Sequence, residues 1–591
     1  MKDVWDVSHI YPTPKDFEDD LADFQNRLTP AVQGYEGKLS DDGELKAFLL
    51  LSREANVKLQ KLYMYAECGS DLDKKDIKKA ELVSKVQLAM QIYSQAASYS
   101  DPEILALGED HVKAFLAAHP ELSEYSLVLD QLFLQKAHVL GAEQEKLLSN
   151  YSPLLGEGPT LYSQLSVADY TPKKVKLSDG KLIEVNQSNW TSLIANAKSP
   201  EDRQAIFESL YTYYDEHKNV YGEIYNQVVQ AELAEMHARG YSSILEEHLS
   251  GKKIPLEVFQ SLIKVASENA APLHKYLQIR AKYLGLKNVR SYDRFIQLAK
   301  SEHKYSYEEA RDIFWASLQG FPTDFQAKAH EVLKEGYVDV YPHLGKRSGA
   351  YSNGTFNIHP YILLNFQGEL DDCFTLAHES GHSIHTLYSE ENQPLLKQDY
   401  TIFVAEIAST FNEHNLLDYL LSSGKLSKND QIYLLQKAID EIVATFYRQT
   451  LFGHYEYEIA KLAEAHQPIN YQVLSNMMIS LYKTYYGIDI SQEKVKPLVW
   501  AYIPHLFYTP FYVYQYATSF TASMLLYDKV KAKEPGAFER YVGLLKSGSS
   551  DYPIAEVKAA GVDLTKEESF LSVTKRMSEL VDKLEVLLFS K

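Results

Sequence analysis

Residues 374–388 read FTLAHESGHSIHTLY and contain the pentapeptide His378-Glu379-Ser380-Gly381-His382. On an α-helix, positions i and i+4 share a face, so both imidazoles can converge on one metal ion. Glu379 follows the first histidine and can reach a water molecule held at that ion and take its proton. The spacing therefore predicts a metal-dependent hydrolytic centre on a helix.

The alternative interpretation of this motif is an amphipathic helix whose two histidines face solvent. The apolar flanks, FTLA before and SIHTLY after, predict instead a buried helix. Two buried histidines without a function would be costly. His385 falls near the same face, but on a straight helix it lies ~10 Å along the axis from His378. We therefore expect His385 to pack or to support a ligand.

A third protein ligand is needed if one coordination position is to stay open for water. The candidates downstream of the motif are Glu390, Glu391, Glu406 and Glu413. The first two follow the motif too closely and sit in a polar turn. Glu406 lies in the apolar segment YTIFVAEIASTFNEHNLL, where a lone acid is expected beside a cation, although it could also be a helix-surface acid. Glu413, seven residues on, can support a ligating histidine.

Helical periodicity dominates the rest of the chain and is clearest in residues 14–29, 43–66, 74–98 and 101–118. Helix-start signals recur at Ser199, Ser306 and Ser427. Strand signals are few: a hairpin at 173–185 and a glycine-punctuated patch at 345–368. We predict a mainly α fold with a small β-sheet close to the metal motif.

The composition excludes several function classes. The 591 residues are 45% hydrophobic, which supports a large core and argues against disorder. The balance of 60 basic and 80 acidic residues gives a net charge of −20, so we expect no nucleic-acid partner. The only cysteines, Cys68 and Cys373, lie far apart, which favours a reducing compartment without disulfides.

Neither the start of the chain nor its longest uncharged stretch predicts export or membrane insertion. The first 20 residues lack the apolar core of a signal peptide, so we expect a cytoplasmic protein. The uncharged stretch from Pro497 to Tyr527 contains three prolines and many tyrosines, whereas membrane spans are dominated by Leu, Ile, Val and Phe. We interpret it as buried protein interior.

Five segments of the chain resemble zinc endopeptidases of the thimet-oligopeptidase clan, most closely the oligoendopeptidase F family. They are HESGH at 378–382, FVAEIASTFNE at 403–413, PHLFYTPFYVYQY at 504–516, SGAYS at 348–352 and WDVSHIYPTP at 5–14. The resemblance covers essentially the whole chain. It implies one zinc ion held by His378, His382 and Glu406, with Glu379 as the catalytic base.

The resemblance also implies a fold and a division of the chain. The expected fold is a large, two-lobed helical metallopeptidase of the zincin type, whose deep central channel admits short peptides and excludes folded proteins. We expect an N-terminal helical region with a β-hairpin over residues 1–195 and a catalytic region over residues 196–591.

The tyrosine-rich segment supplies candidate donors for the oxyanion that peptide hydrolysis creates. They are His505, Tyr508, Tyr512 and Tyr516. Pro510 can open a helix on which Tyr512 and Tyr516 share a face, whereas Tyr514 points elsewhere and is expected in the core. The alternative is an aromatic core helix without a catalytic function.

The glycine-punctuated patch can form a sheet whose edge accepts an extended peptide through main-chain hydrogen bonds. The resemblance favours substrate binding by Gly349, Ala350 and Tyr351. The alternative is an ordinary structural sheet with turns.

Taken together, these patterns predict a cytoplasmic zinc metallo-endopeptidase that hydrolyses internal bonds of short oligopeptides. Its expected partners are peptide substrates, with no nucleic acid and no membrane, and a monomer is plausible. Cobalt or manganese could use the same three ligands. Two other functions stay open: a zinc hydrolase of a non-peptide amide, and a peptide carrier with a degenerate site.

Overall fold

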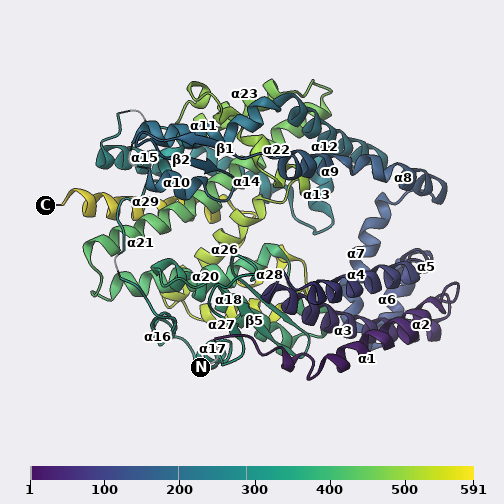
Figure 1. Ribbon diagram of the computed structural model, residues 1–591. Coiled ribbons are helices and arrows are strands. Elements are labelled where there is room, and N and C mark those ends of the chain that lie inside the picture. Colours follow the sequence, from purple (N-terminus) through teal and green to yellow (C-terminus); the bar gives the residue numbers. More distant parts are fainter. Residues whose placement is uncertain (1–2, 198, 288, 302, 591) are drawn as a thin grey trace. The chain divides into compact units, whose positions relative to one another are not determined.

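The computed structural model describes residues 3–197, 199–287, 289–301 and 303–590. Within these ranges the chain forms two compact units, each assembled from three separate stretches of sequence. Both units consist mainly of helices, and each holds one small β-sheet (Figure 1). The predicted mainly α fold with a small sheet is confirmed. The division of the chain at residue 195 and the enclosed channel stay predictions.

The first unit contains residues 3–137, 303–422 and 526–562. Its elements are α1 (Pro14–Asp23), α2 (Thr29–Gln33), α3 (Asp42–Leu72), α4 (Ile77–Ala97), α5 (Ser100–Leu107), α6 (Glu109–Ala118), α7 (Ser126–Gln135), α16 (Tyr307–Ser317), α17 (Thr323–Glu331), β3 (Val338–Asp339), β4 (Tyr351–Thr355), β5 (Ile358–Leu363), α18 (Leu370–Asn392), α19 (Leu395–Gln398), α20 (Ile402–Ser422), α27 (Ala537–Ser547) and α28 (Pro553–Ala559).

The second unit contains residues 138–301, 423–525 and 563–590, apart from the two positions left undescribed. Its elements are α8 (Ala142–Leu155), α9 (Glu157–Ser163), β1 (Lys173–Lys176), β2 (Leu182–Val185), α10 (Trp190–Asn196), α11 (Pro200–Glu216), α12 (Lys218–Arg239), α13 (Ile244–Ser250), α14 (Leu256–Glu268), α15 (Ala271–Leu284), α21 (Lys428–Glu441), α22 (Arg448–Glu464), α23 (Tyr471–Tyr486), α24 (Val499–Tyr502), α25 (His505–Tyr508) and α29 (Glu567–Phe589). Helix α26 (Tyr514–Lys531) begins in this unit and ends in the first.

Three helices begin at the serine caps that the sequence predicts, and the predicted hairpin is present. Ser199 caps α11, which has proline at its first position, and Ser306 and Ser427 form capping boxes at the starts of α16 and α21. Strands β1 and β2 pair antiparallel across the turn that holds Gly180, whose φ of +86° suits glycine.

The sheet of the first unit is braced by the start of the chain. Its strand order is β3-β5-β4, with β5 parallel to β3 and antiparallel to β4. The indole Nε1–H of Trp5 donates to the carbonyl oxygen of Ile362 at 2.8 Å, and the Trp5 ring meets Tyr351 and Tyr361 edge-on. These contacts fix Trp5 against β4 and β5. The strand order makes β4 an outer strand of the sheet.

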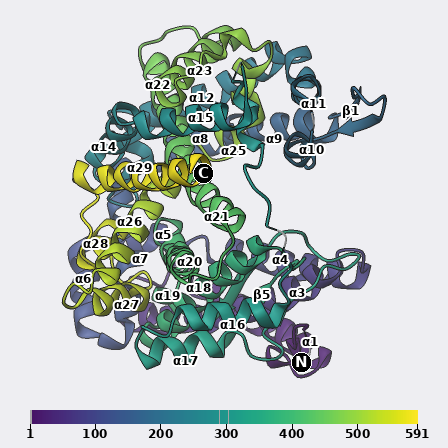
Figure 2. The same ribbon diagram turned by 90° about the vertical axis from the view of Figure 1, so that its left-hand side faces the viewer.

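Helix α18 lies at the centre of the first unit. It packs against α16, α20 and α27 and against strands β4 and β5. In Figure 2, α16, α18 and α20 lie close together beside β5. This burial on several sides agrees with the apolar flanks of the metal motif. Close packing on several sides also restricts the helix more than packing on one side restricts a surface helix.

The uncharged stretch that ends at Tyr527 folds as α24, α25 and the first part of α26. Most of its large side chains are buried in protein, including Trp500, Phe507 and Phe520. Among the described residues, no helix has both the length and the apolarity that crossing a bilayer requires.

Candidate metal centre

The two histidines of the motif lie one turn apart on the same face of α18. The Nε2 atoms of His378 and His382 are 3.2 Å apart, and the two rings are nearly perpendicular. This arrangement follows directly from the four-residue spacing, because α-helical residues i and i+4 lie side by side.

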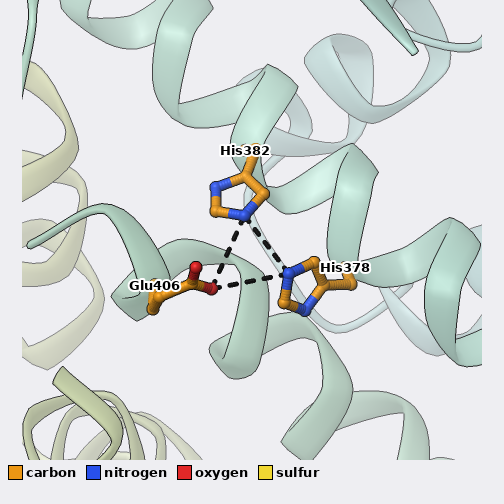
Figure 3. A group of neighbouring side chains, drawn as sticks. All are labelled: His378, His382 and Glu406. Carbon is orange, nitrogen blue, oxygen red and sulfur yellow. Dashed lines mark hydrogen bonds and ion pairs between the residues drawn. The ribbon is translucent and has the colours of Figure 1, made fainter. Parts of the chain in front are cut away.

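Glu406 of α20 completes a group of three donors. Its Oε2 lies 3.4 Å from Nε2 of His378 and 3.6 Å from Nε2 of His382. Figure 3 shows the carboxylate and both imidazoles pointing toward one another. The hydroxyl of Ser409, on the next turn of α20, donates to the same Oε2 at 2.9 Å and orients it.

The donor set fits a zinc ion. Two imidazole nitrogens and one carboxylate oxygen, all within 4.8 Å of one another, are the three-ligand pattern of catalytic zinc sites, which leave a position open. Within the part of the chain that the structure describes, this is the one group of three or more His, Cys, Asp or Glu side chains close enough to hold an ion.

Glu413 contacts the opposite side of the His378 ring. Its Oε1 is hydrogen-bonded to Nδ1 of His378, which leaves Nε2 directed at the other donors. Burial lowers the pKa of His378, but the hydrogen bond and charge of Glu413 outweigh it and raise the pKa to about 10. The same negative partner makes the imidazole a stronger ligand for a cation.

His382 differs from His378 in its electrostatic surroundings. Burial and the neighbouring His378 both hold the pKa of His382 below its usual range. A neutral imidazole is the form that binds a metal ion, so burial prepares this ligand.

Glu379 points toward the β-sheet from the same helix. It is 6% exposed, and the nearby main-chain N–H of Ser352 in β4 favours the charged form of its carboxylate. Burial raises the pKa of Glu379 to about 7, mainly because few water molecules remain to solvate its charge. The hydroxyls of Ser352 and Ser383 lie 2.8 Å apart and tie β4 to the next turn of α18.

Gly381 allows the two metal-site helices to approach each other closely. A Cβ atom at this position would lie 2.5 Å from the carbonyl oxygen of Ala408 and 2.7 Å from the Cα of Ser409. Any side chain would therefore push α20, which carries Glu406, away from α18.

Two further residues of α18 are core residues. His385 is fully buried and stacks on Tyr400 with ring centres 3.5 Å apart, as expected of a packing residue. Cys373 is also fully buried, and burial raises its thiol pKa to about 12, so it is a small apolar residue in practice.

The predicted substrate-binding stretch leads into the outer strand β4. Gly349 has a φ of +85°, and its carbonyl oxygen accepts from Nδ2 of Asn365 at 2.7 Å. The hydroxyl of Tyr351 donates to Asp71 at 2.6 Å, and Arg347 pairs with the same carboxylate. Sequence reasoning missed Asp71 because it lies 280 residues from Tyr351 and belongs to no motif.

Three of the four candidate oxyanion donors form one cluster in the second unit. The rings of His505 and Tyr512 are stacked at 5.7 Å, and Tyr516 meets both edge-on, at 6.2 Å from His505 and 5.6 Å from Tyr512. Burial lowers the pKa of His505, which favours its neutral form.

The structure sets Tyr508 apart from this cluster and corrects the expected start of the helix. Tyr508 is 41% exposed and meets Tyr162 edge-on. Helix α26 begins at Tyr514 and not after Pro510, because Phe511 has a left-handed backbone with φ of +54°. Tyr512 therefore precedes the helix and reaches Tyr516 through a turn. Tyr514 is 2% exposed, as predicted for a core residue.

Comparison with known proteins gives matches over almost the whole chain. The sequence pattern of peptidase family M3 matches residues 193–575, and that of Oligopeptidase F matches residues 103–171. Oligopeptidase PepF of Bacillus subtilis is 34% identical, over 99% of this chain and 87% of the relative. Group B oligopeptidase PepB of Streptococcus agalactiae is 31% identical, over 99% of this chain and 96% of the relative.

Solved structures show the same fold. The crystal structure of a peptidase from Chlamydophila abortus has a TM-score of 0.91 at 30% identity, covering 99% of this chain and 98% of that one. Oligoendopeptidase-F from Enterococcus faecium has a TM-score of 0.76 at 25% identity, covering 98% of this chain and 99% of that one.

Proposed function

Because this chain belongs to peptidase family M3 and is a metallo-endopeptidase, we propose that it hydrolyses internal bonds of short oligopeptides with one zinc ion. The observation that carries this proposal is the convergence of His378, His382 and Glu406 beside the carboxylate of Glu379. The names of the matched relatives, which are oligopeptidases and oligoendopeptidases, support short peptides as the substrate class.

His378, His382 and Glu406 would hold the zinc ion. When bound there, zinc supplies a Lewis acid that polarises the scissile carbonyl and makes water more acidic. Glu413 keeps the ring of His378 in the orientation in which Nε2 is the ligand atom. Nitrogen and oxygen donors in this number favour zinc, and cobalt or manganese can replace it.

Glu379 would move the proton. Its carboxylate takes a proton from the attacking water and then passes it to the nitrogen of the leaving amine. The nearby N–H of Ser352 favours the charged form of this carboxylate, against the effect of burial. General base catalysis of this kind contributes about 10²–10⁴-fold to the rate.

His505, Tyr512 and Tyr516, with Tyr508 as a further candidate, would stabilise the oxyanion of the tetrahedral intermediate. A neutral imidazole and two phenol hydroxyls are hydrogen-bond donors that need no change of charge. The ring contacts among them support a common function, because they fix three donors relative to one another.

Gly349, Ala350 and Tyr351 would bind the substrate backbone. They lead into the outer strand of a sheet that is anchored by Trp5 and by the Asp71 carboxylate. An extended peptide can add to such an edge through main-chain hydrogen bonds. A cytoplasmic location and a monomeric state stay predictions.

The substitution Glu379→Gln tests this mechanism. Glutamine keeps the size of the side chain and cannot take a proton, so we expect full zinc binding with a loss of kcat of about 10²–10⁴-fold. Glu391→Gln, in an exposed position on the last turn of α18, is the matched control and should cleave as the wild type does. Retained turnover in the Glu379→Gln variant would contradict the assignment.

A further inference from the structure

The turn between α25 and α26 contains a strained residue. Phe511 has a φ of +54°, in the left-handed region that residues with a Cβ atom avoid. Backbone of this kind persists only where its surroundings determine it, and it gathers at functional sites. The neighbouring positions carry the candidate oxyanion donors, with His505 before the turn and Tyr512 immediately after Phe511.

A buried carboxyl group of α22 holds this turn. The main-chain N–H of Phe511 donates to Oε1 of Glu456 at 2.8 Å. Glu456 is 4% exposed and Phe511 is 5% exposed, so solvent does not compete for this bond. The other oxygen of Glu456 has no hydrogen-bond partner among the residues that the structure describes. Within the described part of the chain, the hydrogen bond of this buried acid therefore goes to the strained turn.

Two aromatic rings pack against the side chain of Phe511. Its ring lies 5.0 Å from the ring of His248 and 6.0 Å from that of Phe259. His248 is in turn hydrogen-bonded to Glu232 of α12. The backbone of Phe511 is thus held by Glu456 while its ring is held by aromatic neighbours.

The turn transmits this anchoring to the donor cluster. The N–H of Tyr512 donates to the carbonyl oxygen of Thr509 at 3.3 Å, and the hydroxyl of Thr509 lies 3.3 Å from Nδ1 of His505. Tyr512 then stacks on His505 and contacts Tyr516. A change in the backbone at Phe511 would move Tyr512 away from both rings.

We propose that Glu456 is a positioning residue for the reaction, because it fixes the turn at Phe511 and through it the cluster of His505, Tyr512 and Tyr516. This inference rests on the proposed function of that cluster as the oxyanion donors. Burial raises the pKa of Glu456 to about 8, against the opposing effect of the Phe511 N–H, so a neutral amide can take its place.

Three substitutions separate the acceptor oxygen from the charge and the length of Glu456. Glu456→Gln keeps an acceptor at the same position, and kcat should stay within about threefold of the wild type. Glu456→Met keeps the length and removes the acceptor, and kcat should fall about 10²-fold, as expected when catalytic groups are misplaced. Glu456→Asp shortens the side chain and moves the acceptor away from the Phe511 N–H, so kcat should fall about 10-fold. KM for an end-blocked peptide and zinc content should change little in all three.

Glu556→Met is the matched control. Glu556 of the first unit is 6% exposed and also accepts a main-chain N–H, that of Asp551 at 3.2 Å. Its substitution should lower the Tm while leaving kcat within about threefold. A general loss of stability would therefore be distinguished from a loss of positioning.

Several results would overturn the proposal. Wild-type kcat in Glu456→Met, or in Glu456→Asp if the methionine variant does not fold, contradicts it. Equal losses in Glu456→Gln and Glu456→Met also contradict it, since they would assign the effect to the charge. If the wild-type protein with zinc leaves all peptides uncut, the proposed function fails first and this inference fails with it.

Discussion

Glu413 is hydrogen-bonded to Nδ1 of His378, while Nε2 of the same ring is directed at His382 and Glu406. The imidazole is therefore held between a negative charge and the metal centre. Glu406 and Glu413 are seven residues apart, two turns along α20, so one helix face supplies both a candidate ligand and the hydrogen-bond partner of another candidate ligand.

The first prediction concerns this support. Glu413→Ala should weaken zinc binding about 10–100-fold, because the orientation and the basicity of His378 are both lost. Competition with a chromophoric chelator measures the affinity. Glu413→Gln keeps a hydrogen-bond acceptor without the charge, so its zinc affinity should lie between that of the wild type and that of the alanine variant. An alanine variant that binds zinc as tightly as the wild type would show that Glu413 does not support the ligand.

The second prediction concerns the packing of α18 against α20. Gly381→Ala should lower both Tm and zinc affinity, because its Cβ atom would collide with the backbone of Ala408 and Ser409. Overpacking of this kind costs about 1–3 kcal/mol. Gly69→Ala in α3 is the matched control, since nothing lies within 4 Å of its added Cβ atom. The control should keep its zinc and gain about 0.5–1 kcal/mol of stability. If both variants behave alike, the close approach at Gly381 is unimportant.

The three donors of the candidate metal centre could be proposed from the sequence because each carries a local signal. His378, His382 and Glu379 follow from the four-residue period of one helix, and Glu406 stands out as an acid in an apolar helix. The helix caps at Ser306 and Ser427 are equally local. Residues a few positions apart on one helix can be placed relative to one another from their spacing alone.

Contacts between distant segments could not be predicted in this way. The N–H of Ser352 at the Glu379 carboxylate, the Asp71 anchor of Tyr351 and the Glu456 anchor of Phe511 join residues 27 to 280 positions apart. The left-handed backbone of Phe511 also differs from the sequence prediction, because Pro510 favours a helix start at this point. Each of these depends on tertiary packing, which overrides local preference.

The third prediction tests the oxyanion donors by removing single hydroxyl groups. Tyr512→Phe and Tyr516→Phe should lower kcat, by about 10²–10³-fold for a donor that contacts the oxyanion. KM and zinc content should change little, since the ground state does not need these bonds. Tyr514→Phe removes a hydroxyl from the buried neighbour and should leave kcat unchanged. Unchanged kcat in both test variants would exclude the cluster from the reaction.

The fourth prediction concerns substrate binding at the edge of β4. A set of peptides, each N-methylated at one backbone nitrogen, should show raised KM at alternate positions, because hydrogen bonds of a strand alternate in direction. An N-methyl group outside the bound segment provides the control. A KM that does not depend on the position of the methyl group would argue against addition of the peptide to the sheet edge.

The most direct test of the central claim is cleavage of an internally quenched, end-blocked short peptide by the zinc-loaded protein, before and after treatment with a zinc chelator. We expect cleavage at an internal bond that disappears with the chelator and returns when zinc is added. Cleavage that survives complete removal of the metal would contradict the account, as would a zinc-replete protein that leaves a broad set of short peptides intact.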